Sequence, residues 1–190
     1  MDISSLIGTL MSADSTQGIG QTTNTNSSTV QNVLTAALPA LLDGAKTQSQ
    51  DTSTGFAQAL LSHGQKDTSD IAAFLNKVDL IDGGKIVGHL LGSNSGSQIS
   101  SIASSAGASK KDTSSILAAA APLLMSLLGQ QSAANTDSGA GTDAIGAAAA
   151  LLLKNLDVGS ILGSLLGVSS SGKKGKKGLL GAILGKLLKK

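Results

Sequence analysis

Apolar residues recur at helical spacing along most of the chain. Residues 30–41 place Val and Leu three and four positions apart, and the stretches 56–61 and 71–78 repeat that spacing. No stretch alternates apolar and polar residues over the length of a strand with β-branched side chains. The pattern therefore predicts an all-α fold, a compact bundle of several short helices with internal repeats.

Polar tracts rich in Ser, Thr, Asn and Gly separate these stretches. The tract 12–28 has few apolar residues and predicts a flexible linker, and shorter tracts lie at 47–54, 93–97, 130–142 and 169–178. They divide the chain into three predicted parts. Residues 1–28 are a short N-terminal helix with its linker, 29–168 a helical domain, and 169–190 a hinge followed by a basic amphipathic helix.

Short polar side chains and glycines mark the expected helix ends. A side-chain oxygen at the N-cap accepts a hydrogen bond from a free backbone N–H, and a glycine often follows the last turn. The expected N-caps are Thr29, Ser69 or Asp70, Asp82, and Asp112 or Thr113. The expected C-terminal glycines are Gly44 and Gly129.

One internal repeat joins residues 29–44 to residues 112–127, at an offset of 83. It aligns Pro39 with Pro122. A proline inside a helix removes one backbone hydrogen bond and kinks the helix. The two copies are therefore expected to wrap around their surroundings in a similar way.

A second repeat has the pattern G-x-I-h-G-p-L-L-G/K, where h is apolar and p mostly polar. Its copies begin at residues 84, 159 and 181. Glycine costs a helix roughly 0.5–1 kcal/mol relative to alanine, and close helix packing is the usual compensation. The predicted helix-packing residues are Gly84, Gly88, Gly92, Gly159, Gly163 and Gly167.

The composition narrows the chemistry. The 190 residues include no Cys, Trp, Tyr, Arg or Glu, so every charged side chain is Lys or Asp. Thiolate nucleophiles, cysteine-zinc sites and Glu general bases are excluded. His63 and His89 are the two imidazoles, and a pocket joining His89 to Asp79 or Asp82 would be the one route to catalysis. We expect a non-catalytic protein with no cofactor, metal or small-molecule substrate.

Charge is concentrated at the C-terminal end. Residues 173–190 hold seven Lys and no Asp, whereas residues 1–172 hold seven Lys and twelve Asp. In a helix over 178–190, six apolar residues share one face. The predicted binding residues are Lys173, Lys174, Lys176, Lys177, Leu179, Leu180, Ile183, Leu184, Lys186, Leu187, Leu188, Lys189 and Lys190.

Three partners suit such a segment. A basic amphipathic helix binds an anionic membrane surface. The same apolar face is equally suited to dock on the protein's own body, on a second copy in a homo-oligomer, or on a partner protein. The alternative is a nucleic-acid-binding accessory role, with the lysines as a non-specific phosphate clamp, although no Arg or nearby aromatic is present to read or stack on bases.

Targeting features are few. The start of the chain lacks the basic region of a secretory signal, and the longest apolar runs are about half of the ~20 residues that cross a bilayer. We expect a cytoplasmic protein, with peripheral membrane attachment as one option and export by a non-classical route left open.

Residues 82–92 (DGGKIVGHLLG) resemble the hallmark of DUF937, a bacterial family of unknown function. The stretch 117–129, with its Ala-Pro-Leu-Leu-Met-Ser-Leu-Leu-Gly core, and residues 157–162 (DVGSIL) resemble it too. The resemblance spans about residues 30–168. It implies a bacterial, mostly helical protein, distantly similar to YidB-type small helical domains, and brings no activity, cofactor or catalytic residue with it.

Overall fold

The computed structural model describes residues 3–50, 55–134 and 147–151. All of them belong to the first of two units, Met1–Gly159. Described residues form helices, turns and bends without a strand, which confirms the all-α prediction. The elements are α1 (Ile3–Leu10), α2 (Ala13–Thr23), α3 (Ser27–Gln50), α4 (Phe56–Gly64), α5 (Ile71–Leu75), α6 (Leu80–Leu91), η2 (Gly92–Asn94), α7 (Ser95–Ala106) and α8 (Lys110–Ala134), and residues 147–151 are also helical.

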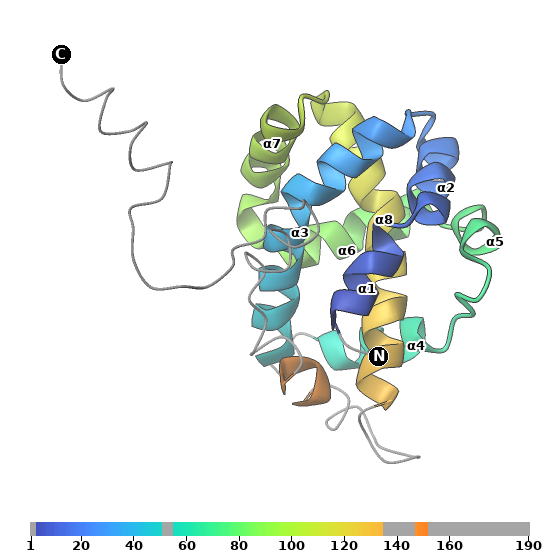
Figure 1. Ribbon diagram of the computed structural model, residues 1–190. Coiled ribbons are helices and arrows are strands. Elements are labelled where there is room, and N and C mark those ends of the chain that lie inside the picture. Colours follow the sequence, from blue (N-terminus) through green and yellow to red (C-terminus); the bar gives the residue numbers. More distant parts are fainter. Residues whose placement is uncertain (1–2, 51–54, 135–146, 152–190) are drawn as a thin grey trace, which may run out of the picture. The chain divides into compact units, whose positions relative to one another are not determined.

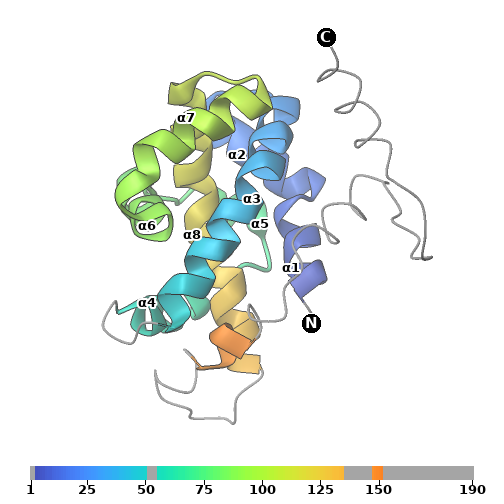
Figure 2. The ribbon, with the colours of Figure 1, turned by 90° about the vertical axis from the view of Figure 1, so that its left-hand side faces the viewer.

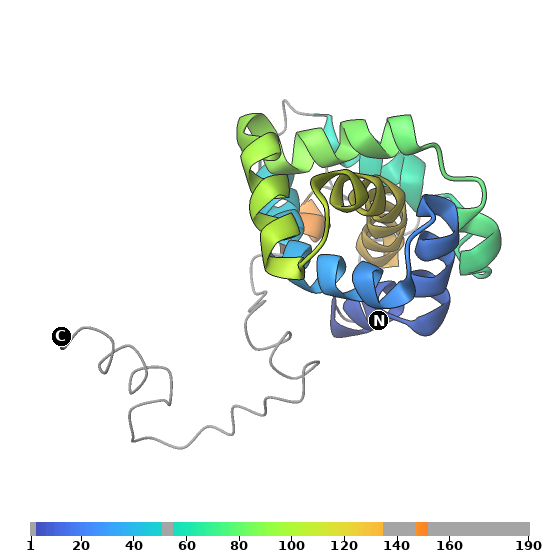
Figure 3. The same ribbon diagram turned by 90° about the horizontal axis from the view of Figure 1, so that it is seen from above.

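Helix α8 occupies the centre of this arrangement. Its residues are buried without interruption from Ile116 to Ser126. It contacts α1, α2, α3, α4, α5, α6 and α7, and the view along its axis shows other helices ringed around it (Figure 3). A helix that is apolar on every side requires such a surrounding. The core of the fold is therefore α8 and the inner faces of the helices around it.

The apolar character of α8 also satisfies the length and composition of a membrane-spanning helix. Its mean hydropathy over an 18-residue window is 1.3, and 78% of that window is buried within the protein. The apolar surface that a bilayer would cover is thus covered by neighbouring helices. The sequence had indicated no span of this length, because polar residues at both ends of α8 interrupt the apolar run.

The two proline-containing copies of the first repeat are both helical, in α3 and α8, but their surroundings differ. Pro39 is exposed on α3, whereas Pro122 is buried in α8. Figures 1 and 2 show α3 running beside α8, with one face of α3 toward it. The expectation that both copies wrap similarly around their surroundings is wrong, because one copy is peripheral and the other central.

The tract 12–28 is not a linker. Residues Ala13–Thr23 form α2, which begins at the N-cap Ser12 and ends at Asn24 in the left-handed conformation (φ 54°). Ile19 is fully buried, and the Thr22 hydroxyl donates to the carbonyl of Leu75 at 3.2 Å. Other hydroxyl groups of α2 donate to carbonyls one turn back. Small and hydroxylated residues therefore pack here with little apolar area.

Helix caps lie close to the expected positions, with shifts of a few residues. Asp70 caps α5, as predicted, by accepting from the N–H of Ala73 at 2.9 Å. Asn26, rather than Thr29, caps α3. At the start of α8, the Ser109 hydroxyl accepts from the N–H of Asp112 and donates to the Asp112 carboxylate.

The predicted C-terminal glycines lie inside helices, where they serve close packing. Gly44 of α3 faces the Leu90 carbonyl, and Gly129 of α8 faces the Leu60 carbonyl. A Cβ added to Gly64 would lie 2.8 Å from the carbonyl carbon of Gly129. These glycines let α3 meet α6, and α4 meet α8, at backbone contact.

The predicted packing glycines of α6 behave differently. Among the described residues, a Cβ added at Gly84, Gly88 or Gly92 would meet nothing within 4 Å. The close contact is made by Gly83, which faces the Ala118 carbonyl of α8. Gly92 instead ends α6 with a positive φ of 64°. Gly159, Gly163 and Gly167 lie outside the described residues.

Candidate functional site

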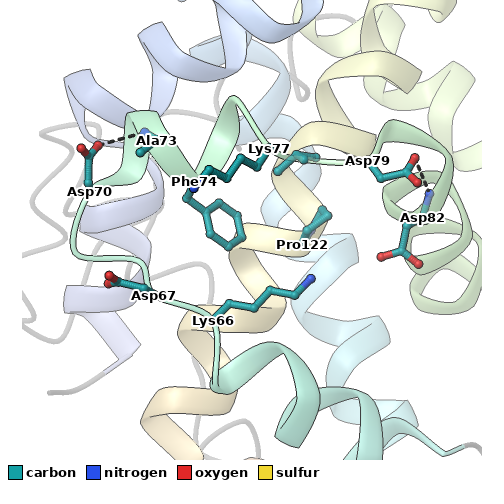
Figure 4. A pocket seen from close by; sticks show the side chains of 10 residues that line it. Lys66, Asp67, Asp70, Ala73, Phe74, Lys77, Asp79, Asp82 and Pro122 are labelled. Atoms are coloured by element: carbon teal, nitrogen blue, oxygen red, sulfur yellow. Dashed lines mark hydrogen bonds between the residues drawn. The ribbon is translucent and has the colours of Figure 1, made fainter.

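A cleft of about 430 Å³ opens beside α5, between the chain leaving α4 and the start of α6 (Figure 4). Its volume is within the usual range of ligand sites. Its lining residues are Lys66, Asp67, Asp70, Ala73, Phe74, Lys77, Val78, Asp79, Asp82 and Pro122.

The centre of the cleft is apolar. Phe74, one of the two aromatic residues of the chain, projects between the α4–α5 segment and α8, with Pro122 of α8 beside it (Figure 4). Val78 and Ala73 complete the apolar lining. Phe74 and Val78 are only half-buried. The fold therefore leaves part of this apolar surface open to a ligand.

Carboxylates flank the apolar centre on two sides. Asp67 and Asp70 lie on the α5 side of Phe74, and Asp79 and Asp82 lie on the α6 side (Figure 4). Lys66 and Lys77 also line the cleft. With four Asp and two Lys, the lining has an acidic balance.

Local hydrogen bonds orient two of these carboxylates at the starts of helices. Asp79 Oδ1 accepts from the N–H of Ile81 at 2.7 Å and of Asp82 at 3.4 Å, so Asp79 is the cap of α6 that was expected at Asp82. Asp70 Oδ1 caps α5 in the same way. Each carboxylate has further lone pairs beyond these bonds. The capping groups are therefore held in place and can still accept from a ligand.

Hydrogen bonds from Ser69 favour the ionised form of Asp67. Its Oδ1 accepts from the N–H of Ser69 at 2.9 Å. Hydrogen bonds from the Ser69 hydroxyl and N–H lower the pKa of Asp67 below its usual value, and the charge of Lys77 adds to this effect. The carboxylate is charged over the physiological pH range.

His63 ends α4 close to this cleft. Its side chain is buried, with 9% exposed, and Nδ1 has no hydrogen-bond partner in the described part of the chain. Burial lowers the pKa of His63, the charge of Lys66 lowers it further, and the charge of Asp82 opposes both. The neutral imidazole is therefore the form that suits the packing between α4 and α8.

His89 does not meet Asp79 or Asp82. Asp79 caps the start of α6 and His89 lies in its last turn, ten residues or about 15 Å along the helix. His89 instead lines a second cleft of about 260 Å³, with Phe56, Ile86 and Met125 among its neighbours. The pocket that would have pointed to catalysis is absent from the described residues. These residues also contain no cluster of three or more His or Asp side chains placed to hold a metal ion.

Sequence reasoning missed the acidic cleft. Four of the twelve Asp residues lie between positions 67 and 82, around Phe74, and this grouping was the available signal. The lining residue Pro122 lies 40 positions beyond Asp82 along the chain, so only the fold brings it to the cleft. The Lys-rich segment 173–190, which was the predicted binding site, lies outside the described residues.

A central apolar helix ringed by other helices defines an all-α architecture, and comparison with known proteins establishes the family. Residues 5–131 match the model of the family described as "Bacterial protein of unknown function (DUF937)". The chain therefore belongs to this family. The match begins in α1, which agrees with the packing of α1 and α2 onto the helical body. Neither the curated proteins nor the solved structures gave a significant match.

Proposed function

We propose that this protein is a non-catalytic interaction protein and that its Lys-rich segment, residues 173–190, attaches it to an anionic membrane surface. The observation that carries the proposal is the charge of this segment, seven Lys without Asp, combined with six Leu and Ile residues at helical spacing. Each Lys near an anionic leaflet contributes about 1 kcal/mol, and apolar burial adds to this. The corresponding location is the cytoplasm, with the protein attached peripherally to the membrane.

The composition of the helical body supports assigning membrane binding to the segment 173–190. The described residues contain seven Asp and six Lys, so the body has no excess of positive charge to attract anionic lipid. Its most apolar helix, α8, is enclosed by its neighbours. The body therefore has little of its own to bind a membrane, and the segment 173–190 supplies both the charge and the apolar residues.

Vesicle co-sedimentation of the full-length chain tests this proposal. Replacing Lys173, Lys174, Lys176 and Lys177 by Gln should weaken binding to anionic vesicles by about 4 kcal/mol, on the order of a thousandfold. The control replaces Lys110 and Lys111, two exposed lysines at the start of α8, and should bind like the unmodified chain. Vesicles of neutral lipid should bind weakly throughout.

One result would contradict the proposal, and a second experiment distinguishes it from the nucleic-acid alternative. Equal vesicle binding by the segment variant and the control would contradict it. Duplex DNA, tested in parallel, distinguishes the nucleic-acid alternative: binding to a phosphate backbone falls steeply with salt, whereas membrane binding should keep an apolar component at high salt.

A further inference from the structure

The second cleft, which His89 lines, differs in chemistry from the acidic cleft. Its lining residues are Gln48, Gly55, Phe56, Ala59, Ile86, His89, Leu90 and Met125. They come from α3, the start of α4, α6 and α8. Phe56, Leu90 and Met125 are at most 7% exposed, and no Asp or Lys is among the described lining residues. The walls of this His89 cleft are therefore mostly buried apolar surface.

Backbone contacts hold the helices around the His89 cleft in place. Gly44 of α3 lies against the Leu90 carbonyl of α6, and Gly129 of α8 makes an equally close contact with α4. Gln48 Nε2 donates to the His89 carbonyl at 3.1 Å, which also ties α3 to the end of α6. Helices in backbone contact cannot move closer together. The space between their side chains is thus preformed, as ligand sites usually are.

The apolar walls favour a ligand over water. Phe56, Ile86 and Met125 offer water no strong hydrogen-bond partner, and displacing poorly held water by an apolar group gains affinity. The volume of about 260 Å³ lies just below the ~300 Å³ at which drug-sized sites begin. The apolar part of a matching ligand is therefore small.

The end of α6 determines the polar group of that ligand. His89 is exposed, and an imidazole donates an N–H in either protonation state. Lys85, also exposed, precedes it by four residues, so the two side chains are neighbours on the helix surface. Asp82 lies seven residues, about 10 Å, before His89, and Asp43 lies about 140° around α3 from Gln48. An N–H donor beside an ammonium group suits a carboxylate.

We propose that the His89 cleft binds a small aliphatic carboxylate. The tail lies against Phe56, Ile86 and Met125, and the carboxylate accepts from the His89 imidazole beside Lys85. The carboxylate is a bound ligand to which no reaction is assigned. The proposal uses no residue of the segment 173–190, so it does not rest on the proposed function.

Hexanoate is the probe, and methionine methyl signals are the readout. The chain has three methionines, Met1, Met11 and Met125, and only Met125 lines the cleft. The full-length chain is labelled with ¹³C at these methyl groups and titrated in an NMR experiment, with Met125→Leu assigning the signal. We expect hexanoate to shift the Met125 signal saturably and to leave the Met1 and Met11 signals in place.

Two matched ligands separate the tail from the charge. Acetate has the carboxylate without the tail and should produce no saturable shift of the Met125 signal, because it buries almost no apolar area. Hexylamine has the same tail with an ammonium group and should bind about fivefold or more weakly than hexanoate, because His89 and Lys85 then face a positive charge.

Three variants at exposed positions, which leave the fold intact, locate the carboxylate. His89→Ala removes the N–H donor and should weaken hexanoate binding about tenfold. Lys85→Gln should weaken it about twofold to fivefold. Lys77→Gln is the control, because it removes the same charge from the acidic cleft and should leave the affinity unchanged.

The proposal is overturned if hexanoate produces no saturable shift of the Met125 signal, or if hexylamine binds as tightly as hexanoate. Hexanoate binding by His89→Ala as tight as by Lys77→Gln would also overturn it. Equal losses in Lys85→Gln and Lys77→Gln would do the same, because binding would then follow net charge alone.

Discussion

Gly83 of α6 lies directly against the carbonyl oxygen of Ala118 in α8, with no room for a side chain between them. The next residue, Gly84, is exposed and has open space where a Cβ would lie among the described residues. Two adjacent glycines in one helix therefore have opposite roles, and they form a matched pair for mutation.

Replacing Gly83 by Ala should destabilise the protein by about 1–2 kcal/mol, because overpacking costs about 1–3 kcal/mol and better helix propensity returns less than about 1 kcal/mol. Replacing Gly84 by Ala should stabilise it by up to about 1 kcal/mol through propensity alone. Urea unfolding monitored by circular dichroism measures both. Equal effects of the two substitutions would show that α6 and α8 are not in backbone contact.

The glycines show which packing contacts could be predicted from the sequence and which could not. The glycine stripe predicted close packing at Gly84, Gly88 and Gly92, and this is wrong, because a Cβ at these positions meets nothing within 4 Å among the described residues. Gly83 and Gly129 make close backbone contacts instead. Which glycine makes the contact depends on the face that α8 meets, and the repeat pattern favoured Gly84 over Gly83. Helical periodicity predicted α3 and α8 well, because both bury regularly spaced apolar residues.

Other features depend on tertiary contacts that no local pattern contains. Helix α2 has one large aliphatic residue, Ile19, and it packs against distant segments, with Gly18 lying against the side chain of Leu75. The acidic cleft likewise requires Pro122, which α8 brings beside Phe74. The four Asp residues near Phe74 were visible in the sequence, but their arrangement around an apolar centre was not.

Burial of Ile19 tests whether α2 is part of the folded body. The side chain is fully buried, so Ile19→Ala should cost about 2–5 kcal/mol of unfolding free energy. Ile81→Ala is the matched control, because Ile81 is 74% exposed and the change should fall within about 0.5 kcal/mol. Denaturant midpoints compare the two, and a negligible effect at Ile19 would restore the view that residues 12–28 are a linker.

His63 should make the fold less stable in mild acid. Its folded-state pKa is lowered, so below about pH 6.5 the unfolded state takes up a proton that the folded state refuses. The free energy of unfolding is therefore insensitive to this group at higher pH and falls as the pH drops from 6.5 toward the folded-state pKa. Thermal melts between pH 5 and pH 8 follow this trend.

Two variants assign the acid sensitivity. His63→Leu removes the titrating group and should flatten the pH dependence in that range. His89→Gln replaces an exposed imidazole at the end of α6 and should leave the dependence on His63 in place. If H63L retains the full pH dependence, the sensitivity arises elsewhere.

Asp79 should act through its cap rather than its charge. Asp79→Ala removes the acceptor for two N–H groups of α6 and should cost about 0.5–2 kcal/mol. Asn is an equally good N-cap, so Asp79→Asn should cost only a few tenths of a kcal/mol. Melting temperatures distinguish the two, and a large loss in D79N would mean that the charge itself stabilises the fold.

The most direct test of the account is the affinity of the full-length chain for anionic vesicles when the lysines of the segment 173–190 are altered. Replacing Lys173, Lys174, Lys176 and Lys177 by Gln should weaken vesicle binding by on the order of a thousandfold, whereas replacing Lys110 and Lys111 should leave it unchanged. Equal affinities of these two variants would contradict the account, because membrane binding would then not depend on the segment.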